Sequence, residues 1–149
     1  MITSHHLRVR VAAVLVKDKK ILLISHQKGG QIYWLLPGGG VDFGESLDQA
    51  LKRELQEELN IKVKVNEPVL ICDSIDDEGR RHILNICFFC EYLSGEYVLG
   101  QEERLYEFDF FEKEKLTDLK IYPPINKELI EFMTFNKIEH LYKGKDWIK

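Results

Sequence analysis

Short apolar segments alternate with polar turns along most of this chain, and this pattern predicts more strands than helices. Residues 8–16 and 21–25 are rich in Val, Ala, Ile and Leu, and the polar residues between them predict a β-hairpin. Residues 26–31 contain two glycines and predict a loop, which a short strand at 32–36 follows. Residues 37–40, a proline and three glycines, suit neither a helix nor the interior of a strand.

One acidic helix is expected next, followed by further strands and a closing helix. The helix covers residues 46–59. The alternation of residues 61–65 predicts a half-buried strand, which Pro68 interrupts before a second extended piece at 69–75. The remaining predicted elements are strands at 82–93 and 104–111 and a helix at 125–140. We therefore expect a single α/β domain over residues 1–149, with a sheet covered by helices.

The composition is that of a globular protein, with 44% hydrophobic and 31% charged residues. The longest apolar run, residues 11–16, is far shorter than the roughly 20 residues of a membrane-spanning helix. The N-terminal sequence lacks the apolar stretch and cleavage site of a secretion signal. We therefore expect a cytoplasmic protein that does not bind membranes.

Acidic residues produce the net charge of −4, and they are concentrated in one segment. Residues 42–61 contain six acids and two bases, so this segment alone carries the whole net charge. The balance argues against a basic surface for duplex nucleic acid. A local cluster of carboxylates suggests a bound cation instead.

The cysteines are expected to be buried thiols rather than a disulfide or metal site. Cys87 and Cys90 have the spacing of a C-x-x-C motif, but they lie in a predicted strand. Residues three apart on a strand face opposite sides, so the two sulfur atoms cannot meet. With Cys72, they are expected to pack in the core.

The predicted helix at 46–59 carries carboxylates on its apolar side. With about 100° between successive residues, its leucines form one apolar arc, and Glu54, Glu57 and Glu58 fall within or beside that arc. Glu54 and Glu58 are also a like-charge pair four residues apart, which destabilises a helix. A solvated acidic face is the alternative, but Lys52 points away from the cluster. Ligation of a hard divalent cation explains the placement better.

Three consecutive glycines, Gly38 to Gly40, leave backbone amides and carbonyls bare just before this helix. A tight strand-to-helix turn is the simpler explanation for them. The Gly-Lys-Ser/Thr of a Walker loop does not follow, and the spacing differs from the dinucleotide-binding fingerprint. Phosphate would therefore have to be held through a metal ion.

Residues 39–61 resemble the signature of the Nudix (MutT-like) hydrolases and read GGVDFGESLDQALKRELQEELNI. The positions that match it at the required spacing are Gly39, Glu45, Arg53, Glu54, Leu55, Glu57, Glu58 and Ile61. One position departs, because Asn60 stands where the family has glycine. Asparagine tolerates the left-handed backbone conformation expected there, so we expect the geometry to survive.

The resemblance implies an α/β/α sandwich with a mixed β-sheet and a loop-helix-loop metal site. It also implies metal-dependent hydrolysis, by attack of water at phosphorus, of a pyrophosphate bond in a nucleoside diphosphate linked to another group. The implied metal is Mg²⁺, for which Mn²⁺ can substitute, and its implied ligands are Glu54, Glu57, Glu58 and the carbonyl of Gly38. Arg53 would orient the glutamates, and Glu45 would brace the loop against the helix.

The reaction also requires a general base. Many members of the family supply it from a loop before a late strand, a few residues ahead of an aromatic residue. Glu102 and Glu103 precede Phe108 in that way. Glu102 is the favoured candidate, and Glu103 and Glu57 are the alternatives.

Substrate contacts are less well marked. Tyr33 and Phe43 lie near the signature and could stack on a base, with core packing as the alternative. Arg80 and Arg81 end a predicted turn and could reach a phosphate, with a solvated turn as the alternative. The expected substrate is a small nucleotide, which could be a nucleoside triphosphate, an oxidised nucleotide or a compound like ADP-ribose.

Two other functions stay open at this point. A catalytically inactive Nudix-fold module could sense nucleotides or regulate a partner, although such modules commonly lose metal-binding glutamates. A purely structural cation site would require neither Arg53 nor the glycines. Many members of the family are homodimers, so the resemblance also leaves a homodimer open.

Overall fold

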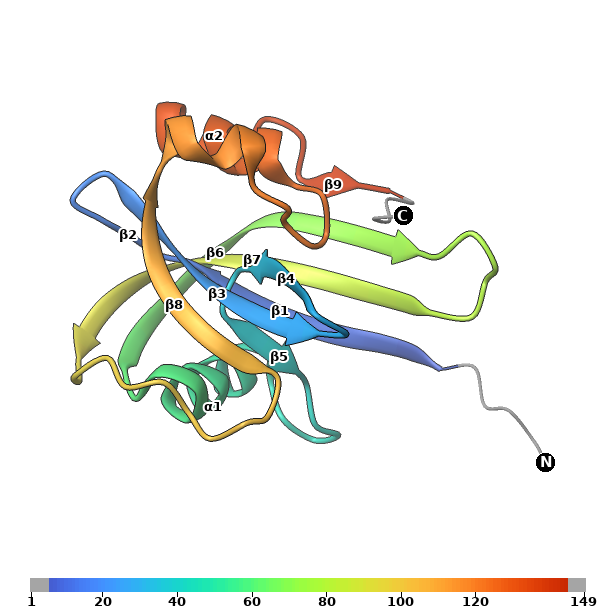
Figure 1. Ribbon diagram of the computed structural model, residues 1–149, viewed down its shortest axis with the longest axis horizontal. Coiled ribbons are helices and arrows are strands. Elements are labelled where there is room, and N and C mark those ends of the chain that lie inside the picture. The colour runs from blue at the N-terminus through green and yellow to red at the C-terminus, as the bar shows by residue number, and fades with distance from the viewer. Residues whose placement is uncertain (1–5, 145–149) are drawn as a thin grey trace.

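The computed structural model describes residues 6–144, which form two β-sheets and two α-helices (Figure 1). The strands are β1 (Leu7–Val14), β2 (Val16–Lys17), β3 (Lys20–Lys28), β4 (Gln31–Leu35), β5 (Gly38–Gly40), β6 (Lys62–Ile75), β7 (His82–Ser94), β8 (Leu105–Glu112) and β9 (Tyr142–Lys143). The helices are α1 (Leu47–Leu59) and α2 (Asn126–Phe135), with a short 3-10 helix, η1 (Lys113–Asp118), before α2.

The larger sheet is mixed, as the resemblance implies. Its strand order is β5-β1-β7-β6-β9. β1 runs parallel to β7 and antiparallel to β5, while β6 runs antiparallel to β7 and parallel to β9. In the second sheet, β3 pairs antiparallel with β2, β4 and β8.

Strand residues alternate between two apolar cores, one beneath each helix. In β1, Val11 packs in the core beneath α1, whereas Ala12 packs in the core beneath α2. The two helices therefore lie on opposite sides of the sheets, which confirms the α/β/α sandwich (Figure 1). Cys87 and Cys90 divide between the two cores in the same way, and all three cysteines are buried thiols, as predicted.

The predicted hairpin of residues 8–16 and 21–25 is confirmed only next to its turn, and the predicted pairing of residues 8–14 is wrong. β1 pairs with β5 and β7 in the larger sheet, and only Val16 and Lys17 pair with the start of β3. The last four residues of β1 are buried on both faces, so this strand takes partners inside a sheet instead of forming a two-stranded ribbon with its neighbour in sequence. The predicted loop at 26–31 is also too long, because β3 continues to Lys28.

Residues 38–40 form β5, although the sequence analysis excluded a strand interior there. They pair antiparallel with β1. A Cβ atom on Gly38 would overlap the carbonyl oxygen of Val11, so the absence of side chains is what lets the two backbones approach. The glycines therefore build an edge strand next to α1.

Pro68 does not interrupt the strand that contains it. β6 runs unbroken from Lys62 to Ile75, and its register against β7 shifts on either side of Pro68. The closing helix is shorter than predicted. It ends at Phe135 because Asn136 adopts a left-handed conformation (φ 59°) and caps it.

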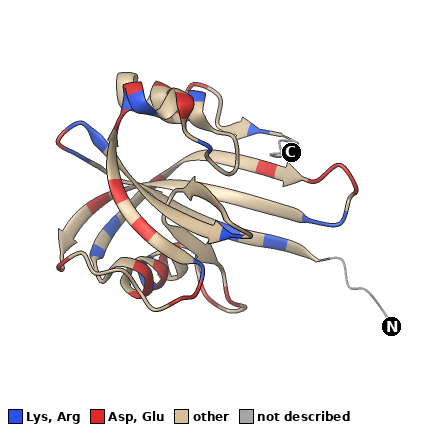
Figure 2. Ribbon diagram, in the orientation of Figure 1, with Lys and Arg blue, Asp and Glu red and all other residues tan. Residues whose placement is uncertain are grey.

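Helix α1 begins and ends as its sequence predicts. Ser46 is the N-cap and forms a capping box with Gln49. At the other end, Asn60 adopts the left-handed conformation (φ 59°, ψ 33°), which confirms the expectation for the position where the signature has glycine. Acidic residues gather on this helix (Figure 2). None of the helices within residues 6–144 has the length and apolar character required to cross a membrane.

Candidate active site

The edge strand β5 turns polar backbone groups toward α1. The amide of Ala13 in β1 donates a hydrogen bond to the carbonyl of Pro37 (2.8 Å). Hydrogen-bonded and non-hydrogen-bonded residue pairs alternate along an antiparallel ladder, so the next residue, Gly38, directs its N–H and C=O away from β1. Accordingly, the N–H of Gly38 donates to Oε1 of Glu58 in α1 (2.9 Å).

Glu58 is the most deeply placed carboxylate of α1, with 4% of its surface exposed. Burial raises its pKa to about 8, although the charge of Arg10 and the hydrogen bond from Gly38 act in the opposite direction. A buried carboxylate of this kind is costly to ionise unless a cation accompanies it.

Glu54 lies one turn earlier, against the backbone of Gly39. A Cβ atom on Gly39 would overlap the carboxyl group of Glu54, so glycine at this position makes room for that carboxylate. Glu54 is half-buried, and burial raises its pKa, while the guanidinium of Arg53 opposes the shift. Both glutamates therefore face β5 from consecutive turns of one helix.

Arg53 ties the preceding loop to the helix. Its Nε and Nη2 donate to the two carboxylate oxygens of Glu45 (2.7 and 2.9 Å), and Nη2 also donates to the carbonyl of Gly40 (3.0 Å). Its Nη1 donates to Oε1 of Glu54 (2.9 Å) and lies 3.3 Å from Oε2 of Glu57. The hydrogen bonds from Arg53 lower the pKa of Glu45 to about 2. These contacts have the geometry that the orienting role of Arg53 and the bracing role of Glu45 require.

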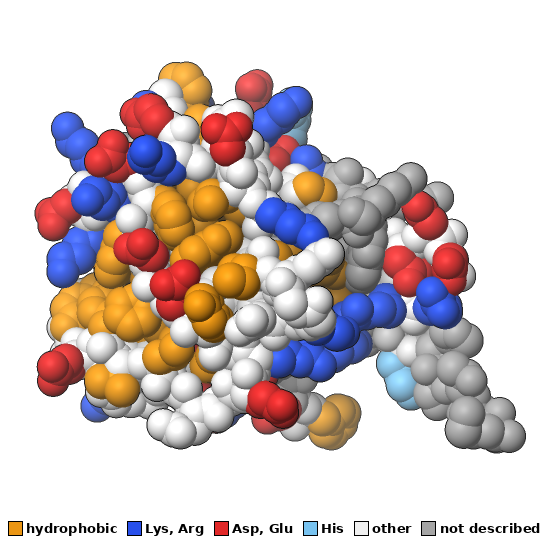
Figure 3. Space-filling view, viewed as in Figure 1, with side chains coloured by type: hydrophobic (Ala, Val, Ile, Leu, Met, Phe, Trp, Pro, Cys, Tyr) orange, Lys and Arg blue, Asp and Glu red, His pale blue; other side chains and the backbone are white. Residues whose placement is uncertain are grey.

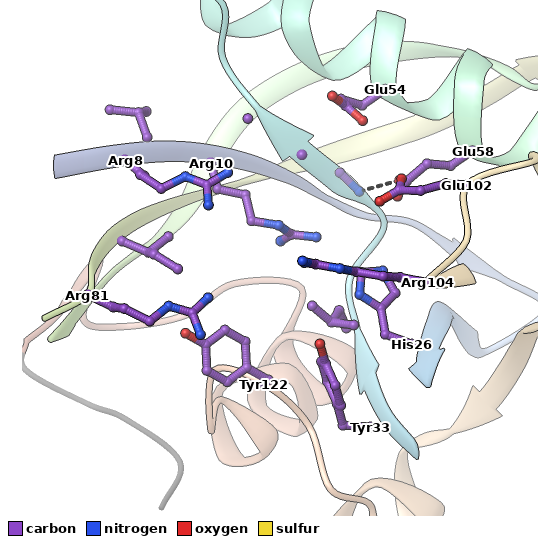
Figure 4. Close-up of a pocket in the computed structure, with 16 residues that line it drawn as sticks. Arg8, Arg10, His26, Tyr33, Glu54, Glu58, Arg81, Glu102, Arg104 and Tyr122 are labelled. Carbon is purple, nitrogen blue, oxygen red and sulfur yellow. Dashed lines mark hydrogen bonds between the residues drawn. The ribbon is translucent and has the colours of Figure 1, made fainter. Parts of the chain in front are cut away.

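The loop before β8 docks on the C-terminal end of α1. The amides of Val98 and Gly100 donate to the carbonyls of Leu59 (3.1 Å) and Glu58 (2.7 Å), which satisfies backbone groups that the helix leaves unpaired. This docking brings Glu102, which lies in the loop between β7 and β8, to a position beside Glu58 (Figure 4).

A cavity of about 220 Å³ lies between these elements (Figure 4). Its carboxylates are Glu54, Glu58 and Glu102, its guanidinium groups are Arg8, Arg10, Arg81 and Arg104, and its aromatic and imidazole groups include Tyr33, Tyr122 and His26. The acids lie toward α1 and the bases toward the strand ends (Figure 4). The cavity is therefore divided into an acidic half and a basic half.

Comparison with known proteins decides the family. The sequence model of the NUDIX domain matches residues 5–133. This chain belongs to the Nudix hydrolase family. It is 33% identical to an ADP-ribose pyrophosphatase of Methanocaldococcus jannaschii over 115 residues, which are 76% of this chain and 67% of that protein. It is 31% identical to an RNA pyrophosphohydrolase of Pelagibacter ubique over 138 residues, which are 87% of this chain and 82% of that protein.

Solved structures show the same fold. A Nudix hydrolase from Nitrosomonas europaea superimposes with a TM-score of 0.77 at 23% identity, covering 89% of this chain and 92% of that one. The match to the family model and the curated relatives make the chain an enzyme of the Nudix family, so the alternative of an inactive nucleotide-sensing module is set aside.

The structure brings some of the predicted site residues to the cavity of this Nudix enzyme and leaves others outside it. Tyr33 and Arg81 line the cavity. Phe43 is fully exposed in the loop before α1, and Arg80 pairs with Glu78 in the turn between β6 and β7. Glu57 is not among the lining residues, and 58% of its side chain is exposed. Phe43 and Arg80 lie outside the cavity because proximity in sequence does not determine which way a loop residue points.

Most residues of the basic half were not predicted from the sequence. Arg8, Arg10, Arg104, His26 and Tyr122 all line the cavity and were not predicted. One signal was available, because two arginines at alternate positions of an otherwise apolar strand must project on the same face. Arg104, His26 and Tyr122 gave no local signal, since only the tertiary structure brings them to the cavity.

The donors around the acidic half suit a hard divalent cation. Carboxylate and carbonyl oxygens are the ligands that Mg²⁺ prefers, and Glu54, Glu58, Glu102 and the outward-facing carbonyl of Gly38 supply them. Within residues 6–144, no three His, Cys, Asp or Glu side chains lie close enough together to coordinate a metal ion in their present conformations. One oxygen of Glu54 is held by Arg53. Metal binding by this set would therefore require the glutamate side chains to turn.

Proposed function

We propose that this chain hydrolyses a pyrophosphate bond in a nucleoside diphosphate linked to another group, with Mg²⁺ as its cofactor and Mn²⁺ as a substitute. The observation that carries the proposal is the division of one cavity into an acidic and a basic half, which suits a cation and a phosphate chain side by side. The names of both curated relatives, an ADP-ribose pyrophosphatase and an RNA pyrophosphohydrolase, describe cleavage of this type of bond.

The cation would be held by the glutamates of α1 with the carbonyl of Gly38. When bound, it would neutralise phosphate charge and acidify the attacking water. Glu54, Glu57 and Glu58 provide the carboxylates, and Glu58 is held in place by the amide of Gly38. Glu57 is outside the cavity lining, so its side chain would have to turn to reach the cation. Arg53 acts as a positioning residue, because it keeps Glu54 and Glu57 in orientation while it binds the loop.

Glu102 is proposed as the general base. It lies beside Glu58 at the edge of the acidic half, on a loop whose backbone is bonded to α1 (Figure 4). In the proposed step, Glu102 accepts a proton from water as the oxygen of that water forms a bond to phosphorus. The pyrophosphate P–O bond then breaks, and its electron pair leaves with the departing phosphate oxygen. Guanidinium groups in the basic half hold the phosphate chain.

The test compares Glu102→Gln with Glu103→Gln. Glu103 is the adjacent carboxylate, is exposed and does not line the cavity, so it is the matched control. Hydrolysis of ADP-ribose and of a nucleoside triphosphate is followed in Mg²⁺ and in EDTA, with the products separated by anion exchange. Loss of a general base lowers kcat by about a hundredfold or more. We expect this loss for Glu102→Gln alone.

Three results would count against the proposal. Activity that persists in EDTA would show that the reaction does not depend on a metal ion. Equal losses of activity in the two variants would show that Glu102 is not the general base. No turnover of either substrate class by the folded wild-type protein in Mg²⁺ or Mn²⁺ would contradict the proposed reaction itself.

A further inference from the structure

The side chain of Asn60 forms contacts that glycine at this position could not form. The left-handed backbone at the end of α1 suits glycine and asparagine alike, so it does not by itself explain an asparagine here. The amide group of Asn60 is bonded at both ends. Its Oδ1 accepts a hydrogen bond from Nε2 of Gln56 in α1 (3.1 Å), and its Nδ2 donates to the backbone carbonyl of Glu96 (3.0 Å). Asn60 therefore joins the helix to the segment that follows β7.

That segment is the loop before β8, residues 95–104, which runs past α1 (Figure 1). A Cβ atom on Gly95 would overlap the carbonyl oxygen of Asn60, and a Cβ atom on Gly100 would overlap that of Glu57. The two glycines therefore let the loop backbone approach the backbone of the last helical turn. The hydrogen bond from Asn60 lies at the start of this contact, where the chain has just left β7.

Aromatic side chains support the same loop from the sheet. The ring of Tyr97 stacks on those of Tyr92 in β7 and Phe108 in β8, with ring centroids 5.6 Å and 5.8 Å away. Figure 3 shows hydrophobic side chains gathered along β8 on this face of the molecule. These contacts hold Tyr97 to the sheet, whereas Asn60 holds the neighbouring residue, Glu96, to α1. The loop is therefore fixed from two sides.

This loop carries Glu102 to the cavity. Glu102 follows Gly100 by two residues, and its carbonyl accepts a hydrogen bond from the amide of Leu105 at the start of β8 (3.1 Å). The position of its carboxylate relative to Glu58 is thus set on one side by the contacts with α1 and on the other by β8. A loop that loses its first anchor can shift along the helix, and a displacement of about 1 Å can lower a rate about a hundredfold.

We propose that Asn60 is a positioning residue, whose side-chain amide holds the loop before β8 so that Glu102 lies beside the glutamates of α1. The assignment rests on the proposed function, in which Glu102 is the general base. Glycine, which the signature has at this position, would keep the helix end and remove the anchor. Asn60 is exposed to solvent, so its hydrogen bond adds little to the free energy of unfolding, and its removal should change catalysis without unfolding the protein.

The first test measures the loop itself, without substrate. Hydrogen–deuterium exchange compares the wild type with Asn60→Gly and Asn136→Gly. Asn136 is the matched control, because it is also a left-handed helix cap (φ 59°), but α2 lies on the opposite side of the sheets. We expect the amides of residues 95–104 to exchange at least about tenfold faster in Asn60→Gly and at the wild-type rate in Asn136→Gly. Unchanged exchange in Asn60→Gly, or an equal acceleration in Asn136→Gly, would overturn the proposal.

The second test separates positioning from a merely structural role. Steady-state kinetics in Mg²⁺ with ADP-ribose and a nucleoside triphosphate compares Asn60→Gly in the wild type and in Glu102→Gln. In the wild type, we expect kcat to fall by about tenfold or more. KM should stay nearly unchanged, because Arg104, which lines the cavity from the same loop, is held to β3 by the amide of Gln27 (3.0 Å). In Glu102→Gln, the same change should lower kcat by less than about twofold, because the group that Asn60 positions is already lost.

The failures of the two proposals can be distinguished. A wild-type kcat in Asn60→Gly, or losses that multiply in the double variant, would overturn the role of Asn60 and leave the proposed function standing. A wild-type kcat in Glu102→Gln would overturn Glu102 as the general base and the role of Asn60 with it. No hydrolysis of either substrate by the folded wild type would overturn the proposed function, while faster exchange in Asn60→Gly would retain the role of Asn60 in holding the loop.

Discussion

Replacing Glu58 with glutamine should remove the loss of stability that this protein suffers at alkaline pH when no metal is present. Glu58 is 4% exposed, and folding raises its pKa from 4.5 to about 8. The folded state therefore binds this proton more tightly than the unfolded chain does. Its contribution to stability is complete below about pH 4.5 and is lost as the pH rises through about 8. Glutamine keeps the acceptor for the amide of Gly38 and cannot ionise.

The magnitude follows from the size of the shift. Each pH unit between the two pKa values lowers the free energy of unfolding of the wild type, relative to the variant, by about 1.4 kcal/mol. Over the whole interval the loss is roughly 5 kcal/mol, which is a large part of the stability of a single domain. Glu58→Gln should therefore be about as stable as the wild type near pH 4 and much more stable near pH 9.

Urea denaturation in EDTA from pH 4 to pH 9 measures both curves. The comparison near pH 4 is an internal control, because there both side chains are neutral. Adding Mg²⁺ at pH 9 should stabilise the wild type and leave Glu58→Gln nearly unchanged, since the cation compensates only an ionised carboxylate. Parallel stability curves for the two proteins across the pH range would refute the reasoning, because they would mean that burial does not oppose ionisation of Glu58.

Other substitutions test neighbouring parts of the site. Arg53→Lys should lower kcat/KM by about 10- to 100-fold, because an ammonium group cannot hold both oxygens of the loop carboxylate; steady-state kinetics with unchanged far-UV circular dichroism would verify this. Gly39→Ala should displace Glu54 and weaken Mg²⁺ binding by about tenfold or more in calorimetry. Gly40→Ala is the control and should leave Mg²⁺ binding unchanged, because a Cβ atom on Gly40 would contact no other atom. Asn60→Ala should lower the free energy of unfolding by about 1–2 kcal/mol in urea, and Asn60→Gly by less, because only alanine resists the left-handed conformation.

Features of this enzyme that arise within a short stretch of chain were predictable. The capping box of Ser46, the left-handed Asn60 and the acidic side of α1 depend on contacts between residues a few positions apart. The bond between Arg53 and Glu45 also spans only eight positions. Local spacing determines such contacts almost completely, so the sequence predicted the helix, its ends and the cluster of glutamates.

Strand partners were less predictable, because apolar alternation describes a strand and not its neighbour. β1 pairs with β7, which lies about seventy residues away, instead of with the next apolar segment. The three glycines became a strand only because β1 accepts a backbone at close range. Pairing of this kind is decided by which arrangement buries both faces of β1, and that depends on the whole chain.

The two halves of the cavity differ in how far the sequence could predict them. The carboxylates of the acidic half lie mostly on one helix, and the spacing of Glu54 and Glu58 predicted that they share one side of it. The basic half is assembled from Arg10, Arg81 and Arg104, which are far apart in sequence and meet only when both sheets have formed. The sequence thus determined the family and the acidic side of α1, because helical periodicity is local. The folded structure alone decided which basic side chains line the cavity, because strand pairing brings together residues that no local pattern connects.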